Sequence, residues 1–168
     1  MVITPLSLDD INSKAPYTVW RSDADGSFRF VSGYNIVFVV DFMQDDLILS
    51  NNTYQLIIGN TGNRKSPRDN KVRETILAIV EEFFSKNTAA LLYICETGDG
   101  KQKARGRLFT YWFETSSHHR LYTTMTSTLV DEDGIENVAT LIIRNDNPDF
   151  NKLVAEFTQT VTFLSHKP

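Results

Sequence analysis

Short apolar runs separated by polar turns occupy the first part of the chain and predict β-strands. The segment Asp23-Ala24-Asp25-Gly26 is typical of a hairpin turn. Strands are expected at 17–21, 27–32, 36–42 and 53–58. The run 36–42 is apolar at nearly every position, which predicts a central strand covered on both faces.

Beyond residue 60 the apolar positions take helical spacing in some segments and continuous runs in others. Ser66 followed by Pro67, with an acid two residues later, is typical of a helix start, with Ser66 as N-cap. Helices are expected at 67–86, 100–113 and after 147–149, and strands at 89–95, 120–130 and 136–144. Strands 53–58 and 89–95 are joined through a helix, which favours a parallel crossover between them.

These elements predict an α+β protein with a single mixed β-sheet flanked by helices. The expected order is β-β-β-β-α-β-α-β-β-α, in one domain that spans residues 1–168. The residues expected in the core are the apolar positions on the sheet-facing sides of the middle elements: Val72, Ile76, Ile79, Phe83, Leu91, Ile94, Leu108 and Trp112.

The amino-acid composition excludes several classes of protein but does not indicate which reaction, if any, the protein catalyses. The chain has 168 residues, 41% of them hydrophobic and 23% charged, which is ordinary for a globular domain. Its one cysteine, Cys95, excludes an internal disulfide and a cysteine-built zinc site. No apolar run approaches the roughly 20 residues that cross a bilayer, and the first residues lack a signal-peptide pattern. The expectation is a cytoplasmic protein with no membrane partner.

The net charge of −4 hides a basic middle segment. Residues 61–113 carry ten Lys and Arg against six Asp and Glu, whereas each flank has a balance of −4. Cations near helix N-termini are locally unfavourable, so either a bound anion or nearby acids such as Glu96 and Asp99 should offset them. The sequence predicts an anion-binding patch formed by Arg68, Lys71, Lys101 and Arg105, with internal ion pairing as the alternative. The low pI, about 5.3, argues against nucleic acid as the partner.

Histidine, serine and aspartate residues are the candidates for metal binding and catalysis. His118 and His119 are adjacent, so their side chains point in different directions and no metal site is expected. No Gly-x-Ser-x-Gly elbow of a serine hydrolase occurs. Asp41 is the one charge in a very apolar strand, where either a solvent-facing strand end or a catalytic role would explain it.

Four segments of the middle region carry a resemblance. The first two are Asp69-x-Lys71-Val72-x-x-Thr75-Ile76 and Glu82-Phe83-Phe84. The last two, which are fairly specific in combination, are Leu92-Tyr93-Ile94-Cys95-Glu96 and Asp99-Gly100-Lys101-Gln102-x-x-Arg105-x-Arg107-Leu108-Phe109-x-x-Trp112-Phe113. Through them the stretch from Ser66 to Phe113 resembles an uncharacterised bacterial family of unknown function. This resemblance implies no known activity.

The predicted order of elements also resembles the core of the GNAT acetyltransferases. That resemblance implies acetyl-CoA at the first helix N-terminus and a tyrosine as general acid in the second helix, which by rough position is Tyr111. The glycine-bearing loop of that superfamily is absent, and Arg68-Asp69-Asn70-Lys71-Val72 stands in its place.

Three functional hypotheses follow from these patterns. The first is a non-catalytic GNAT-like domain that binds a protein partner or an anionic ligand and needs no cofactor. The alternative is an acyl-CoA-dependent N-acyltransferase, with Asp41 or Glu96 as base and Tyr111 as acid. The third is another phosphate-handling enzyme.

Overall fold

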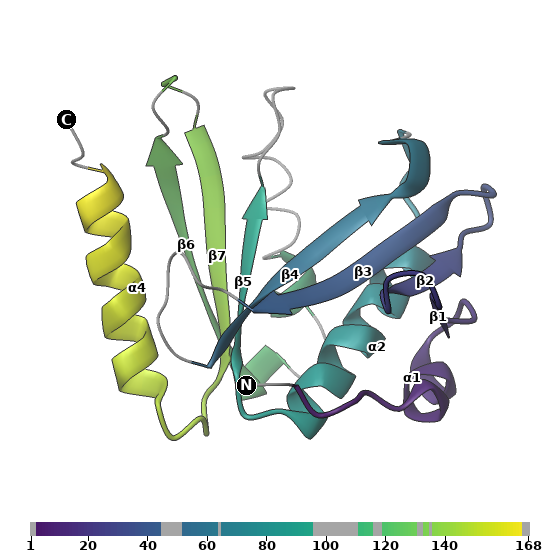
Figure 1. Cartoon of the computed structure of the whole chain (residues 1–168), viewed down its shortest axis with the longest axis horizontal. Coiled ribbons are helices and arrows are strands. Elements are labelled where there is room, and N and C mark those ends of the chain that lie inside the picture. Colours follow the sequence, from purple (N-terminus) through teal and green to yellow (C-terminus); the bar gives the residue numbers. More distant parts are fainter. Residues whose placement is uncertain are drawn as a thin grey trace. The chain divides into compact units, whose positions relative to one another are not determined.

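The fold is α+β, with one mixed sheet and helices, as the sequence predicts (Figure 1). The computed structural model describes residues 3–44, 52–63, 65–95, 111–115, 119–130, 133–134 and 136–165. The helices are α1 (Leu8–Lys14), α2 (Asn70–Lys86) and α4 (Phe150–Ser165), the short 3-10 helices are η1 (Thr61–Asn63) and η2 (His119–Leu121), and residues 111–114 are also helical. The strands are β1 (Trp20–Arg21), β2 (Phe28–Val31), β3 (Val37–Gln44), β4 (Thr53–Asn60), β5 (Ala90–Cys95), β6 (Tyr122–Val130) and β7 (Glu136–Arg144).

The seven strands follow the order β1-β2-β3-β4-β5-β7-β6 in the sheet. Strands β4 and β5 are therefore neighbours in one sheet, as predicted. The pairs β1–β2, β2–β3, β5–β7 and β6–β7 are antiparallel. The chain divides into two compact units, one of residues 1–43 and 56–88 and the other of residues 44–55 and 89–168.

Helix α1 precedes the first strand and was not predicted. Ser7 caps it, with its Oγ accepting a hydrogen bond from the backbone N–H of Asp10 at 3.2 Å. Asp9 and Asp10 place negative charge in the first turn, where the helix dipole favours it. The helix has seven residues and Ile11 is the one that is buried, so the sequence offers no apolar periodicity by which to detect it.

The start of α2 also differs from the prediction, which placed the N-cap at Ser66. The cap is Asp69, whose backbone is extended and whose carboxylate accepts a hydrogen bond from the Lys71 N–H at 2.9 Å. The Ser66 hydroxyl instead donates to the Pro67 carbonyl. Aspartate is as good an N-cap as serine, and a proline restrains the residue before it to extended backbone. Because Asp69 is the cap and α2 begins at Asn70, Arg68 lies before the helix and not in its first turn.

In the first unit, α2 covers one face of the strands. Phe42 of β3 stacks on Phe83 of α2, with ring centroids 4.6 Å apart, and Phe30 of β2 stacks on Phe38 of β3 at 5.3 Å. Burial alternates along β3: Phe38 and Val40 are buried, whereas Val37, Val39 and Asp41 are half-buried. One face of this strand is therefore buried and the other is only partly covered, whereas the sequence predicts a strand covered on both faces.

The segment before β1 is fastened to α2 by polar contacts. The Ser7 N–H donates to Glu82 Oε2 at 2.6 Å, and Asn87 exchanges two hydrogen bonds with the Thr4 backbone. Lys86 adds an ion pair to Asp10 at 3.3 Å. These contacts hold α1 beside the C-terminal half of α2.

In the second unit, α4 packs on the strands β5, β6 and β7. Its core comprises residues of β5, β7 and α4, namely Ala90, Leu92, Ala139, Leu141, Ile143, Leu153, Phe157 and Val161. Residues 138–143 of β7 are buried at every position, so both faces of this strand are covered. Of the predicted core, five residues are buried, Ile94 and Trp112 are half-buried, and Leu108 lies outside the described residues. None of the helices in the described ranges has the length and apolarity that a membrane span requires.

Candidate functional site

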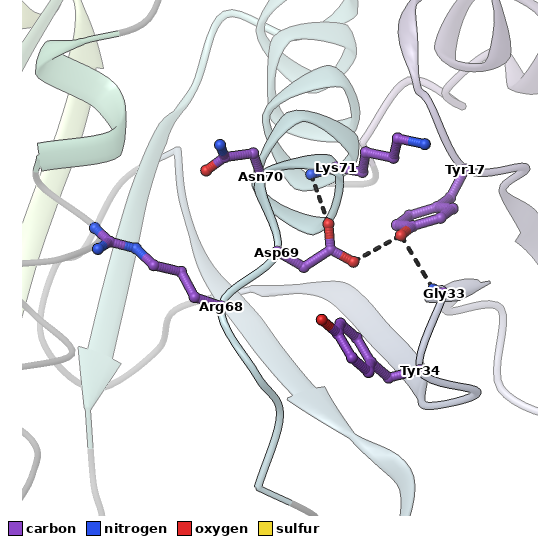
Figure 2. Close-up of a pocket in the computed structure, with 7 residues that line it drawn as sticks. All are labelled: Tyr17, Gly33, Tyr34, Arg68, Asp69, Asn70 and Lys71. Atoms are coloured by element: carbon purple, nitrogen blue, oxygen red, sulfur yellow. Dashed lines mark hydrogen bonds between the residues drawn. The ribbon is translucent and has the colours of Figure 1, made fainter.

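An open pocket of about 490 Å³ lies at the N-terminus of α2 in the first unit (Figure 2). Three parts of the chain form it: the segment before β1, the turn between β2 and β3, and the start of α2. Its lining residues are Tyr17, Gly33, Tyr34, Arg68, Asp69, Asn70 and Lys71.

The hydroxyl of Tyr17 joins these three parts. It donates a hydrogen bond to Asp69 Oδ2 at 2.6 Å and accepts one from the Gly33 N–H at 3.0 Å (Figure 2). The other carboxylate oxygen of Asp69 accepts the Lys71 N–H. Both oxygens of Asp69 are therefore engaged, and the pocket is held in shape before any ligand binds.

Gly33 leaves room for the Tyr17 hydroxyl, and Asp69 changes the pKa of that hydroxyl. A Cβ added at Gly33 would lie 3.2 Å from the Tyr17 hydroxyl oxygen, which is tight for a side chain. The hydrogen bond to Asp69 is the main cause that raises the pKa of Tyr17 above its ordinary value of 10.0. Ionising the phenol beside a carboxylate is unfavourable, so Tyr17 remains a hydrogen-bond donor near neutral pH.

Of the predicted anion-binding residues, the structure brings Arg68 and Lys71 to this pocket. Both side chains are exposed, and neither forms an ion pair with a carboxylate in the described part of the chain. In Figure 2 they extend to opposite sides of Asp69. The Asp69 carboxylate accepts the backbone N–H of Lys71, the second residue of α2, at the helix end where a bound anion was expected. Lys101 and Arg105 lie outside the described residues.

The structure does not bring the predicted catalytic residues, Asp41, Glu96 and Tyr111, together in a site among the residues it describes. Glu96 lies outside the described residues. Asp41 belongs to β3 in the first unit, and Tyr111, whose side chain is 51% exposed, belongs to residues 111–114 in the second. Partial burial raises the pKa of Asp41 above its ordinary value of 3.8, against the opposing effect of the Phe42 N–H that donates to its Oδ1 at 2.9 Å.

Five of the seven lining residues were not predicted as site residues, namely Tyr17, Gly33, Tyr34, Asp69 and Asn70. Gly33 and Tyr34 lie in the sequence Ser32-Gly33-Tyr34-Asn35, between two expected strands. An aromatic residue inside such a polar turn is a signal for exposure, and Tyr34 is 54% exposed. No comparable signal marks Tyr17, whose role depends on residues far along the chain. Among the described residues, no group of three His, Cys, Asp or Glu side chains is placed to hold a metal ion.

Comparison with known proteins matches part of the chain to a protein family. Searches of curated proteins and of solved structures found no similar protein. Residues 68–159, just over half of the chain, match the Family of unknown function (DUF6169). This region includes Arg68, Asp69, Asn70 and Lys71 of the pocket, whereas Tyr17, Gly33 and Tyr34 precede it. The resemblance to an uncharacterised family is thereby confirmed, and the chain belongs to the Family of unknown function (DUF6169).

Proposed function

We propose that this protein is a non-catalytic binding domain whose pocket at the start of α2 takes an acidic segment of a protein partner. The observation that carries the proposal is the pair of exposed cations, Arg68 and Lys71, beside a pocket that Tyr17 holds in shape. A pre-formed site loses less conformational entropy on binding than a mobile one.

The side chains of the pocket suit binding more than chemistry. Tyrosine and arginine are enriched among the residues that dominate protein interfaces, and Tyr34 and Arg68 are both exposed here. The lining contains no serine, cysteine or histidine, and the one carboxylate, Asp69, already accepts two hydrogen bonds. A nucleophile with an adjacent base, which covalent catalysis requires, is therefore missing from this pocket.

The position of Asp69 favours an extended acidic segment over a small anion. A single phosphate at the helix N-terminus would face the Asp69 carboxylate and be repelled by it. Arg68 and Lys71 extend to opposite sides of that carboxylate (Figure 2), so two separate acidic groups reach them more readily than one. Carboxylates spaced along a peptide satisfy this geometry.

Titration with a short oligo-glutamate peptide, followed by isothermal calorimetry, tests the proposal. Arg68→Ala and Lys71→Ala should each weaken binding about two- to fivefold, because an exposed charge pair contributes up to about 1 kcal/mol. The weakening should shrink as salt rises. Lys14→Ala removes an exposed cation outside the pocket and should leave the affinity unchanged.

Absence of binding to the wild-type protein, or equal losses in all three variants, would contradict the proposal. Acyl-CoA and inorganic polyphosphate serve as comparison ligands. Tighter binding of acyl-CoA than of the peptide would instead support the acyltransferase hypothesis.

We also propose that residues 1–168 behave as one domain. Strand β4 contributes residues 53–55 to one compact unit and residues 56–60 to the other. Separating the units would break a strand in its middle. A single transition in calorimetric unfolding is expected, and two resolved transitions would overturn the proposal.

A further inference from the structure

Strand β6 forms one edge of the sheet. It is last in the strand order and pairs with β7 along all nine of its residues, from Tyr122 opposite Arg144 to Val130 opposite Glu136. No strand in the described part of the chain pairs with its other side. An edge strand presents a row of backbone N–H and C=O groups that can pair with another strand.

Three features that usually prevent such pairing, namely charge, proline and a bulge, are absent from the described strand β6. The nine residues from Tyr122 to Val130 include no charged residue and no proline, and their register against β7 runs without a bulge. The opposite edge is different: β1 has two residues, and one of them is Arg21. Short, charged edges resist strand addition, whereas long, uncharged ones invite it.

We propose that β6 pairs antiparallel with β6 of a second copy of this chain, across a two-fold axis at Thr126. Two identical strands place each residue opposite its symmetry mate, so a charge near the centre would meet a like charge. The uncharged composition of β6 avoids that repulsion. The axis places Thr124 of one copy opposite Thr128 of the other, and Tyr122 opposite Val130.

The side chains on one face of β6 suit these pairs. Threonine pairs and aromatic–β-branched pairs are favourable between antiparallel strands. A threonine pair already exists within the chain, where Thr126 Oγ1 lies 3.0 Å from Thr140 Oγ1 of β7. Val130 is 49% exposed, and the half-buried Tyr122 of the second copy would cover it.

The size of the contact predicts a weak dimer. Nine residues per strand form an interface at the low end of the range for specific complexes, below about 1,200 Å². We therefore expect a dissociation constant of about 10–100 μM, so that dimers dominate only in concentrated solution.

Sedimentation velocity over a concentration series tests the proposal with two charge variants. The wild-type mass should rise from 19.1 kDa toward twice that value as concentration increases. In the double variant Thr124→Lys, Thr128→Lys, the lysine at position 124 of each copy faces the lysine at position 128 of the other copy. This repulsion should weaken the dimer at least about tenfold. Thr124→Glu combined with Thr128→Lys makes the same positions opposite in charge and should restore dimerisation.

The outcomes separate an effect on assembly from an effect on folding. Circular dichroism checks that each variant is folded, and if the double-lysine variant is unfolded, the wild-type and Glu/Lys proteins still decide the question. A wild-type protein that is monomeric at about 1 mM, well above the expected dissociation constant, overturns the proposal. A folded double-lysine variant that dimerises as well as the wild type overturns it too.

Discussion

Strands β3 and β7 are both mainly apolar, but their surroundings differ. Each is a run of mainly apolar residues, Val37–Gln44 in one compact unit and Glu136–Arg144 in the other. In β7 every residue from 138 to 143 is buried. In β3 burial alternates, and Met43 near its end is 55% exposed.

The difference shows that an apolar run does not by itself reveal whether one or both faces of a strand are covered. One face of β7 packs on α4 and the other face is buried as well. β3 has α2 against one face, through the stacked rings of Phe42 and Phe83. The number of covering layers depends on elements elsewhere in the sequence.

The largest expected loss of stability comes from a substitution that creates a cavity beside β7. Leu141→Ala removes a side chain with no exposed surface and should lower the free energy of unfolding by about 2–5 kcal/mol. Urea denaturation measures the loss.

A matched pair of substitutions compares the two strands directly. Val138→Ala in β7 acts at a side chain that is 4% exposed, and Val39→Ala in β3 acts at a half-buried one. The first should cost about 2 kcal/mol and the second less than about 1 kcal/mol, because the energy follows the apolar area removed from water. Equal losses would mean that the outer face of β3 is covered in solution.

The next effect concerns the polar contacts that hold α2 in the unit that contains β3. Asp69→Ala removes the N-cap and the acceptor of the Tyr17 hydroxyl, and should cost about 1–3 kcal/mol. Asp69→Asn keeps an oxygen for the cap and should cost less. Tyr17→Phe removes the hydrogen bond to Asp69 and should lower the free energy of unfolding by less than Asp69→Ala does. If all three variants were as stable as the wild type, the pocket would not be pre-formed.

A smaller effect follows from the charge that β3 carries on its half-buried face. Burial raises the pKa of Asp41 in the folded protein above the ordinary value of 3.8. The ionised carboxylate therefore opposes folding, and this penalty appears as pH rises through 3.8 and the higher folded value. Asp41→Asn should raise stability at pH 7 by less than about 1 kcal/mol, because the group is only partly buried. The gain should vanish at pH values below 3.8, and a gain independent of pH would contradict this explanation.

The smallest effect is a difference in titration between two carboxylates of the same unit. The hydroxyl and backbone N–H of Ser27, and then Arg29, lower the pKa of Asp25 to about 2. Carbon-detected NMR should therefore show Asp25 titrating well below Asp41. Ser27→Ala removes the largest cause and should raise the pKa of Asp25 toward 3.8, whereas Thr158→Ala on α4, in the other unit, should leave it unchanged.

Local patterns were enough to predict most of the elements and the fold class. Strands β2, β3, β4, β5, β6 and β7 and helices α2 and α4 lie within a few residues of their predicted ranges. Hydrophobic periodicity, turn residues and cap residues act over one or two turns of chain, so they can be read without the rest of the molecule. Helix α1 was missed because it buries a single apolar residue, Ile11.

Only the tertiary structure decided where the pocket lies and which strand is covered on both faces. Tyr17 is 52 positions from Asp69 and 16 from Gly33, so no local pattern predicts the hydroxyl that joins them. Asp69 could be read as an acid in the first turn, but its role as N-cap depended on which of two competing caps the folded chain uses. The sequence by itself determined the elements, because their causes are local. Burial and hydrogen-bond partners were decided by the fold, because they depend on residues that only folding brings together.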